Sequence, residues 1–337
     1  MSAMDHKYNY VIFNASDSGL PTFNDEGYYS ICLKDLWGKD YVHINAFAFD
    51  YLNTFIGKVL RRLMIIAGKI SPLIQGVFFR KYVNLQFKNP DKPICFVCFR
   101  YVELSYLKYL KKQYPDAKFI KYVRDIISTQ QAHYDKYKSA NVFDHWITYD
   151  EGEAAHYGMK YFNEIESKID LPEEAKDIKY DVFFAARAKK RLPQIIKVYD
   201  KLVSLGVKPF FYITNAKEDE QVHRDGIVYT DELLSYRQML IYSCQAKFML
   251  EINQEGAVGY TSRYIEAILY NKRLLSDNMA LINAPYYNPK NIQCFKDIDE
   301  IDVKDMMLDT PVNYNYRGDF SPIHLVDYIE KVITEKQ

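Results

Sequence analysis

An arginine and a carboxylate lie three residues apart in one stretch of the sequence, from Lys247 to Asn278. An apolar run leads into a polar loop with two glycines, and helical apolar spacing then begins near Thr261. On that helix Arg263 and Glu266 fall on the side away from the apolar residues, so we expect their side chains to lie off the core. Because the amino end of a helix favours anions, the pattern predicts a ligand with both phosphate and sugar hydroxyls.

A second group of charges follows a predicted strand that begins at Tyr180. The strand runs through small residues into a basic first helical turn that contains Arg187 and Lys190. Cations at this position oppose the helix dipole, which indicates an anion nearby that offsets them. A solvated basic turn is the alternative interpretation.

A third polar group ends the first predicted strand, Tyr8 to Phe13. The loop from Asn14 to Gly19 is small and polar and carries Asp17, so backbone can approach a ligand there. An ordinary turn aspartate is the alternative for Asp17. The loop is not Gly-x-Gly-x-x-Gly, and the sequence has no Gly-Lys-Ser/Thr loop. The fingerprints for nicotinamide dinucleotides and for ATP are therefore missing.

Strands and helices alternate along most of the chain. This order predicts doubly wound parallel sheets, and the length allows about two domains. A charged segment that contains Pro172 is a plausible interdomain linker. The expected units are residues 1–165, a linker over 166–179, a second domain over 180–320 and a C-terminal helix over 321–337.

The composition excludes several classes of protein. The chain has 337 residues, is 48% hydrophobic and carries 44 basic and 44 acidic residues, so neither disorder nor bulk attraction to nucleic acid is indicated. Five scattered cysteines include Cys95 and Cys98, which lie in an apolar run that is typical of a buried strand rather than a zinc site. No signal peptide or membrane-spanning run is found. We expect a reduced cytoplasmic protein without a zinc site.

One segment alternates apolar and basic residues, over positions 55–81. An ordinary surface helix that buries its apolar stripe is one interpretation. The other is contact with an anionic membrane surface or with a lipid-linked acceptor, which would place the protein at the inner face of the cell membrane.

Four motifs together resemble bacterial GT-B glycosyltransferases of surface-polysaccharide biosynthesis. They are Lys121-Tyr-Val-Arg-Asp125, Phe143-Asp-His-Trp-Ile-Thr-Tyr-Asp150, a segment from Gln254 to Ala267 similar to Gln-x-Gly-x-Thr-x-Arg-x-x-Glu-Ala, and Asn271-Lys-Arg-Leu-Leu-Ser-Asp-Asn278. The resemblance covers roughly residues 118–295. The loop after Gln254 is longer than in that group, and the Glu-x7-Glu spacing of many retaining enzymes is absent. Retention and inversion at the sugar both stay open.

The resemblance implies two Rossmann-like domains that face a cleft, with the C-terminal helix packing back. The amino-terminal domain would bind a saccharide or lipid-linked acceptor, and the second would bind a nucleotide sugar, with UDP as the expected nucleotide. The implied donor-binding residues are Arg187, Lys190, Asn215, Tyr229, Gly259, Thr261, Ser262, Arg263 and Glu266. Of these, Glu266 would hold the ribose, and Arg187 would also act in catalysis by neutralising the departing diphosphate. If the enzyme inverts, the acceptor base would be Asp17 or Asp125, with His133 behind them.

Two other functions compete with this interpretation. The resemblance implies metal-independent chemistry that needs no cofactor. Asp297 and Asp299 instead have the Asp-x-Asp form that holds a metal in GT-A glycosyltransferases, but a helix start explains them more simply. The second competitor is a non-catalytic subunit that binds a nucleotide sugar without turning it over.

Overall fold

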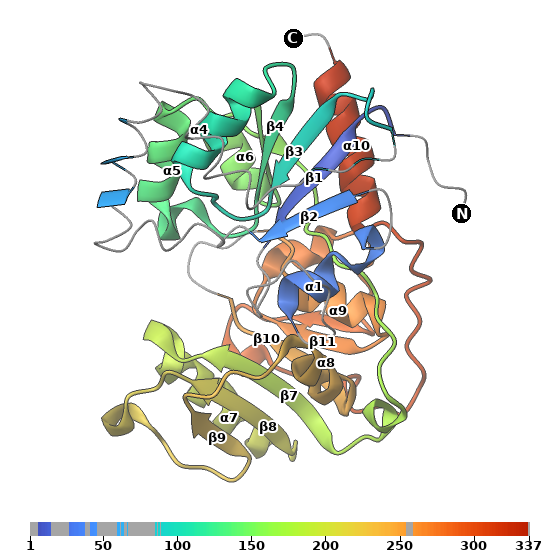
Figure 1. Cartoon of the computed structure of the whole chain (residues 1–337). Helices are drawn as coiled ribbons and strands as arrows, with labels where there is room; N and C mark the ends of the chain where they lie inside the picture. The colour runs from blue at the N-terminus through green and yellow to red at the C-terminus, as the bar shows by residue number, and fades with distance from the viewer. Residues whose placement is uncertain are drawn as a thin grey trace.

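Two parallel six-stranded sheets organise the computed structural model of the chain (Figure 1). The structure describes residues 6–14, 27–37, 41–45, 89–253 and 259–335, together with positions 59, 60, 62, 63, 66, 85 and 87; the side chain of Lys189 is excluded. Asp17 and most of the 55–81 segment therefore lie outside the described residues.

Sheet A has the strand order β2-β1-β3-β4-β5-β6. Its strands are β1 (Asn9–Asn14), β2 (Tyr41–Asn45), β3 (Ile94–Cys98), β4 (Lys118–Val123), β5 (His145–Thr148) and β6 (Lys160–Tyr161). The helices that accompany it are α1 (Tyr28–Cys32), α4 (Leu104–Gln113), α5 (Gln131–Ser139) and α6 (Glu151–Tyr157). Cys95 and Cys98 are fully buried in β3, as the apolar run predicts.

Sheet B has the order β12-β11-β10-β7-β8-β9. Its strands are β7 (Tyr180–Arg187), β8 (Pro209–Thr214), β9 (Ile227–Thr230), β10 (Ala246–Glu251), β11 (Arg273–Ser276) and β12 (Ile292–Cys294). Its helices are α7 (Leu192–Ser204), α8 (Tyr236–Cys244) and α9 (Ser262–Leu269). The predicted doubly wound α/β architecture is confirmed for both sheets.

The last helix, α10 (Pro322–Thr334), packs against sheet A although it follows sheet B in the chain (Figure 1). Ser321 caps its amino end by accepting a hydrogen bond from the Ile323 amide, and proline follows at the first helical turn. Its buried residues share one cluster with β1: Leu325, Val326, Ile329, Tyr10 and Ile12. The expectation that this helix packs back is confirmed.

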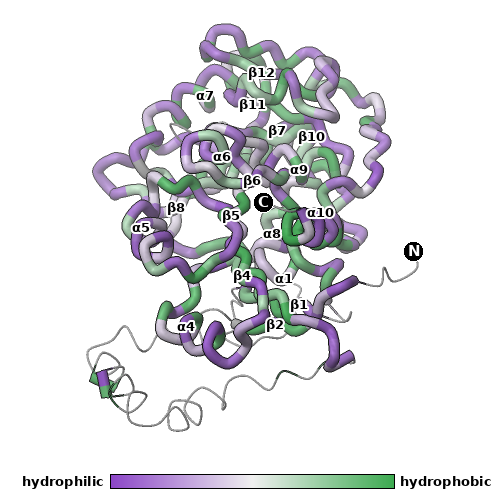
Figure 2. Tube along the Cα trace, turned by 90° about the horizontal axis from the view of Figure 1, so that it is seen from above, coloured by the Kyte–Doolittle hydropathy of each residue, from purple (hydrophilic) through white to green (hydrophobic). Residues whose placement is uncertain are grey.

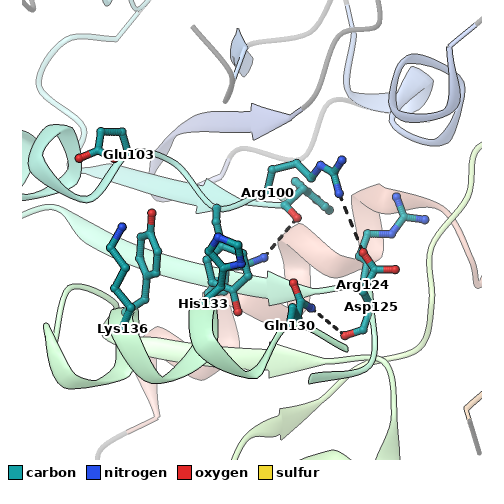
Figure 3. A pocket seen from close by; sticks show the side chains of 11 residues that line it. Arg100, Glu103, Arg124, Asp125, Gln130, His133 and Lys136 are labelled. Atoms are coloured by element: carbon teal, nitrogen blue, oxygen red, sulfur yellow. Dashed lines mark hydrogen bonds and ion pairs between the residues drawn. The ribbon is translucent and has the colours of Figure 1, made fainter. Parts of the chain in front are cut away.

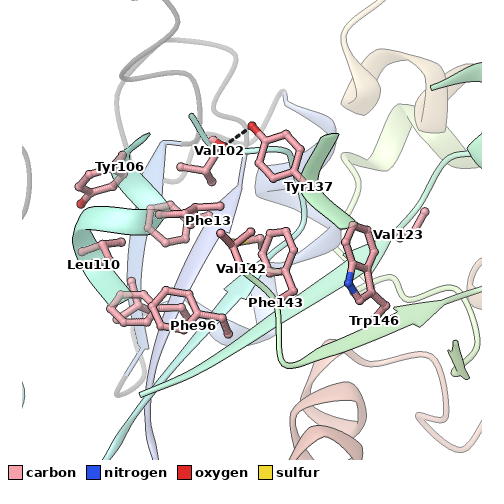
Figure 4. Packing of buried hydrophobic residues seen from close by; sticks show 14 of the residues in the cluster. Phe13, Phe96, Val102, Tyr106, Leu110, Val123, Tyr137, Val142, Phe143 and Trp146 are labelled. Carbon is pink, nitrogen blue, oxygen red and sulfur yellow. Dashed lines mark hydrogen bonds between the residues drawn. The ribbon is translucent and has the colours of Figure 1, made fainter. Parts of the chain in front are cut away.

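Apolar side chains fill the space between sheet A and its helices α4 and α5 (Figure 4). Phe96 stacks on Phe119 with ring centroids 4.7 Å apart, and the Tyr137 hydroxyl donates a hydrogen bond to the Val102 carbonyl. Figure 2 shows hydrophobic residues at β4 and hydrophilic stretches along many outer turns. This packing holds α5 against sheet A, with Tyr137 bonded to the segment that follows β3.

The two sheets are joined by a buried contact between α1 and α8. Ile31 and Cys32 of α1 share an apolar cluster with Tyr236 and Leu240 of α8. The rings of Tyr28 and Tyr236 meet edge to face with centroids 4.8 Å apart. This contact between α1 and α8 is therefore aromatic and apolar.

Candidate functional site

The chain changes direction across sheet B at β7. It runs from β7 to β8 on one side, and β10 later pairs with the other side of β7. Ligands of open α/β sheets bind outside the carboxyl ends of the strands at such a switch point. The region just outside the carboxyl ends of β7 and β10, called the crevice below, is therefore the first place to look for a ligand.

The basic turn lies at this crevice. Arg187 is the last residue of β7 and is exposed, and Lys190 is exposed as well. The neighbouring Arg191 is partly buried, and its Nη1 donates a hydrogen bond to the Ile252 carbonyl just beyond β10. Burial lowers the pKa of Arg191, and the charge of Asp277 opposes that shift. Arg191 belongs to the predicted basic turn, but its role in joining the β7 and β10 loops is visible only in the fold.

A buried carboxylate that sequence reasoning missed ends β10. Glu251 is 5% exposed, and its oxygens accept hydrogen bonds from the hydroxyls of Thr261 and Ser276. Burial raises the pKa of Glu251. The Thr261 hydroxyl, predicted to hold a diphosphate, is thus bound to Glu251. A carboxylate directly after an apolar strand and before a polar loop was the signal that could have found Glu251.

Asp277 connects the loops after β10 and β11 with the start of α7. Its carboxylate accepts hydrogen bonds from the Asn253 amide at 2.8 Å and from Nε2 of Gln194 at 3.2 Å. Next to it, Nδ2 of Asn278 donates to the Gly259 carbonyl at 3.1 Å. These contacts fix the loops around the crevice before any ligand arrives.

Gly259 lies against the other half of the molecule. A Cβ atom at this position would come within 3.0 Å of the Tyr149 ring and 3.2 Å of the Tyr149 carbonyl oxygen. Tyr149 directly follows β5 of sheet A. Gly259, one of the predicted donor-binding residues, therefore lies against the carboxyl edge of sheet A.

Glu266 does not lie off the core, and the expectation for this residue is wrong, whereas Arg263 is partly exposed. Glu266 is 0% exposed, because α9 is covered on its polar side by α8 and by the segment that joins the sheets. Arg263 donates to Glu266 and, at 3.0 Å, to the Ser243 hydroxyl of α8. Helical spacing showed only that these side chains leave the Ile265 and Ile268 face. It did not show that a second surface covers them.

The network around Glu266 extends into sheet A. The Tyr236 hydroxyl lies 2.8 Å from Oε1 of Glu266 and also contacts Glu166. Arg124, which directly follows β4, donates through Nε to Glu164 at 2.6 Å and through Nη2 to the Tyr28 hydroxyl at 2.8 Å. Predicted contacts of Arg263 and Glu266 with a donor would compete with these bonds, so they are not part of the function proposed below.

The remaining predicted donor residues are spread along the edge of sheet B. Ser262 is the first residue of α9 and is partly exposed, near the crevice. Asn215 is exposed directly after β8, the neighbour of β7. Tyr229 lies on the edge strand β9, and its hydroxyl bonds to the Val222 amide and carbonyl, each at 3.1 Å. Tyr229 is therefore engaged in holding its own loop.

A cavity of about 410 Å³ opens at the carboxyl ends of β3 and β4 (Figure 3). Asp125 and His133, the predicted base and the residue behind it, both line it. Asp125 lies 3.9 Å from Nη1 of Arg100, and His133 stacks on Tyr101 with centroids 5.4 Å apart. The structure thus brings together two of the three residues predicted for proton transfer.

A buried lysine forms the floor of this cavity. Lys121 is 2% exposed, and its Nζ donates to the carbonyls of Cys98, Phe99 and Tyr122 at 3.2, 3.2 and 2.8 Å. Burial lowers the pKa of Lys121 to about 7, whereas three carbonyl acceptors favour the ammonium form, which has three N–H donors. We assign the ammonium form because it satisfies all three bonds.

The Asp-x-Asp motif caps a short helix in the structure. The Asp297 carboxylate accepts a hydrogen bond from the Asp299 amide, and Glu300 completes a capping box with Asp297. The Asp299 side chain is 94% exposed and lies 3.7 Å from Lys201. The described residues contain no group of three or more His, Cys, Asp or Glu side chains placed to hold a metal ion. These contacts favour the helix-start interpretation of the motif.

Two observations on the described residues concern the membrane. Within the described part of the chain no helix has the length and apolar content to cross a membrane. The described apolar residues of the basic amphipathic segment are exposed: Val59, Leu60, Leu63 and Ile66.

Comparison with known proteins identifies the fold. No protein-family model and no curated protein matches the sequence. Among solved structures, the Anabaena protein Alr3699/HepE, in complex with UDP and glucose, is 11% identical, with a TM-score of 0.52 over 97% of this chain and 99% of that one. MnaA of S. aureus with UDP is 12% identical, with a TM-score of 0.48 over 97% and 98%. The chain spans about half of TarM, covering 52% of it at 13% identity and a TM-score of 0.44. The chain has the two-sheet GT-B fold.

Proposed function

We propose that the protein is a glycosyltransferase that moves a sugar from a nucleotide-sugar donor to a saccharide or lipid-linked acceptor. The observation that carries the proposal is the position of the basic turn. Arg187 and Lys190 stand exposed at the switch point of sheet B. The neighbouring strand β10 ends at Glu251, which Thr261 contacts directly before α9 begins. A diphosphate in this crevice would meet two cations and the amino end of a helix.

The chemistry follows from the charge that develops on the leaving group. Breaking a sugar–phosphate bond leaves negative charge on the nucleoside diphosphate, and nearby cations lower the barrier by stabilising that charge. Arg187 and Lys190 supply the cations, and Ser262 adds a donor at the amino end of α9. No metal takes part in this proposal. Asp297 supports a capping box instead.

The acceptor would enter from sheet A. Asp125 and His133 line the cavity there, and Asp125 is exposed enough to reach an acceptor hydroxyl. In an inverting reaction Asp125 would take the proton from that hydroxyl, and Asp17 remains a predicted alternative. A retaining reaction would not require either residue.

The finer assignments have separate support. UDP as the nucleotide is supported by the complex of HepE with UDP and glucose, a protein of the same fold. A role in surface-polysaccharide synthesis is supported by the sequence motifs alone. Membrane contact is supported by the exposed Leu63 and Ile66 in a basic segment. Flotation with anionic but not neutral vesicles would test that contact.

A turnover assay tests the proposal. The purified protein should release UDP slowly from a UDP-sugar, with or without EDTA. Arg187→Ala should lower the rate at least about tenfold. Lys208→Ala is the matched control, because Lys208 is an exposed cation just before β8, near the opposite end of the same sheet. Dependence on Mn²⁺ would support metal-dependent chemistry, and binding without turnover would support a non-catalytic subunit.

A further inference from the structure

We propose that the acceptor is anionic and that its carboxylate or phosphate binds in the sheet A cavity. This inference rests on the proposed function and adds the chemical class of the acceptor. The cavity at the ends of β3 and β4 has the volume of a small-molecule site, about 410 Å³. One or two sugar rings would fit such a space.

The charge of the lining is the first argument. Four cationic side chains and two acidic ones line the cavity. The cations are Arg100, Lys121, Arg124 and Lys136, and the acids are Glu103 and Asp125. Glu103 has a structural role, and Asp125 offsets the charge of one cation. Glu103 caps α4 by accepting from the Ser105 amide at 3.3 Å, and Asp125 lies 3.9 Å from Arg100. Glu164 forms an ion pair with Arg124 and offsets its charge. Lys121 and Lys136 therefore carry the remaining positive charge of the lining.

Lys121 makes the strand ends suitable for an anion. Carbonyl oxygens at the carboxyl ends of parallel strands would otherwise repel negative charge. The Lys121 ammonium occupies three of them, from Cys98, Phe99 and Tyr122. The floor of the cavity therefore carries the positive charge of Lys121. Without this lysine it would present only the partial negative charges of the carbonyl oxygens.

Aromatic rings lie beside these cations and hold them in place. The Tyr101 ring lies 4.7 Å from Nζ of Lys121, and its centroid is 4.9 Å from that of Tyr137, which is 3% exposed. A cation near the face of an aromatic ring is attracted to it. Lys136 extends from α5 one position before Tyr137, with its Nζ 5.3 Å from that ring. An anionic group on the sugar would thus reach Arg100 or Lys136 while its hydroxyls lie near Asp125 and His133 (Figure 3).

Binding of small anionic sugars tests the inference directly. The probes are glucuronate, glucose 1-phosphate and neutral glucose, titrated by NMR into the full-length protein. We expect either anionic probe to bind at least ten times more tightly than glucose. Preference for glucuronate would assign a carboxylate, and preference for glucose 1-phosphate would assign a phosphate. Equal affinity for all three probes would overturn the proposal.

Two variants locate the binding. Lys136→Gln should lower the affinity for the preferred anionic probe at least tenfold. Arg100→Gln should lower it by a similar factor. Lys138→Gln is the matched control on the same helix, because Lys138 is exposed but does not line the cavity. Equal losses in Lys136→Gln and Lys138→Gln would contradict a specific site.

Measuring the affinity for UDP in the same variants tests the proposed function separately from this inference. UDP affinity should be unchanged in Lys136→Gln and lowered in Arg187→Ala, while Arg187→Ala should keep its affinity for the anionic sugar. If Arg187→Ala keeps its affinity for UDP, the donor site is refuted. If Lys136→Gln keeps its affinity for the anionic sugar, the anionic acceptor is refuted.

Discussion

The Tyr236 hydroxyl lies 2.8 Å from Oε1 of Glu266, in a buried position between the two sheets. The same hydroxyl contacts Glu166, so one proton of tyrosine is placed between two carboxyl groups. A hydroxyl can donate only one hydrogen bond, and an ionised carboxylate cannot donate at all. One of the two carboxyl groups must therefore be protonated. Glu266 is paired with Arg263, which leaves Glu166 as the protonated one.

Removing the Glu266 carboxylate should destabilise the protein. Glu266→Ala would leave the partly buried Arg263 without its carboxylate partner, at a cost of about 3 kcal/mol in the free energy of unfolding. The expectation from the sequence was that the Glu266 side chain lies off the core, which would make the substitution harmless to the fold. Urea denaturation measures the effect, and Glu232→Ala is the control because Glu232 is exposed. An unchanged midpoint for Glu266→Ala would show that the network contributes little.

Protonation of Glu166 should make stability depend on pH. Burial, followed by the charge of Glu266, raises the pKa of the Glu166 carboxyl well above its usual range. A raised folded-state pKa gives a contribution that is complete below about pH 4.3 and is lost as pH rises through the folded value. Glu166→Gln keeps a neutral donor there. Its stability should therefore fall less than that of wild type between about pH 5 and pH 8. Parallel melting profiles for the two proteins would rule out this assignment.

Gly259 should tolerate no side chain without a loss of donor binding. A methyl group would press on the ring and the carbonyl oxygen of Tyr149, so the donor loop or the sheet contact would have to shift. We expect Gly259→Ala to raise the KM for the donor several-fold with a modest change in Tm. Tyr149→Ala in the same protein should restore part of the loss, because the ring contact is then gone. No coupling between the two substitutions would contradict the contact.

The Asp-x-Asp pair should affect stability and not metal dependence. Asp297→Ala removes a helix cap and should cost about 1 kcal/mol. Asp299→Ala removes an exposed carboxylate and should change neither stability nor turnover. Sugar release measured with EDTA or Mn²⁺ should be the same for both variants and wild type. A selective loss of turnover in Asp299→Ala would revive the metal-dependent alternative.

The sequence predicted the repeating architecture well because that information is local. Apolar runs such as Ala246–Glu251 and helical spacing such as that of Pro322–Thr334 are sufficient to indicate buried strands and a packed helix. Element boundaries are less certain from local order: Arg187 was predicted in the first helical turn after the strand, whereas it is the last residue of β7.

The surroundings of individual polar side chains could not be predicted in the same way. Glu266 meets Tyr236 and Glu166, which lie 30 and 100 residues away in sequence, so its burial depends on how the two sheets dock. The sequence singled out Asp125 as a functional residue and not its neighbour Arg124. In the structure Arg124 donates a hydrogen bond to the Tyr28 hydroxyl of α1. Periodicity identifies the face of a helix, but it does not show what covers that face.

Hydrogen exchange with and without UDP tests the central claim most directly. If a nucleoside diphosphate binds at the switch point of sheet B, amides over residues 187–191 and 259–263 should exchange more slowly with UDP present. Amides over residues 99–103, at the sheet A cavity, should be unchanged. Protection confined to the sheet A cavity, or no protection at saturating UDP, would contradict the assignment of the donor site.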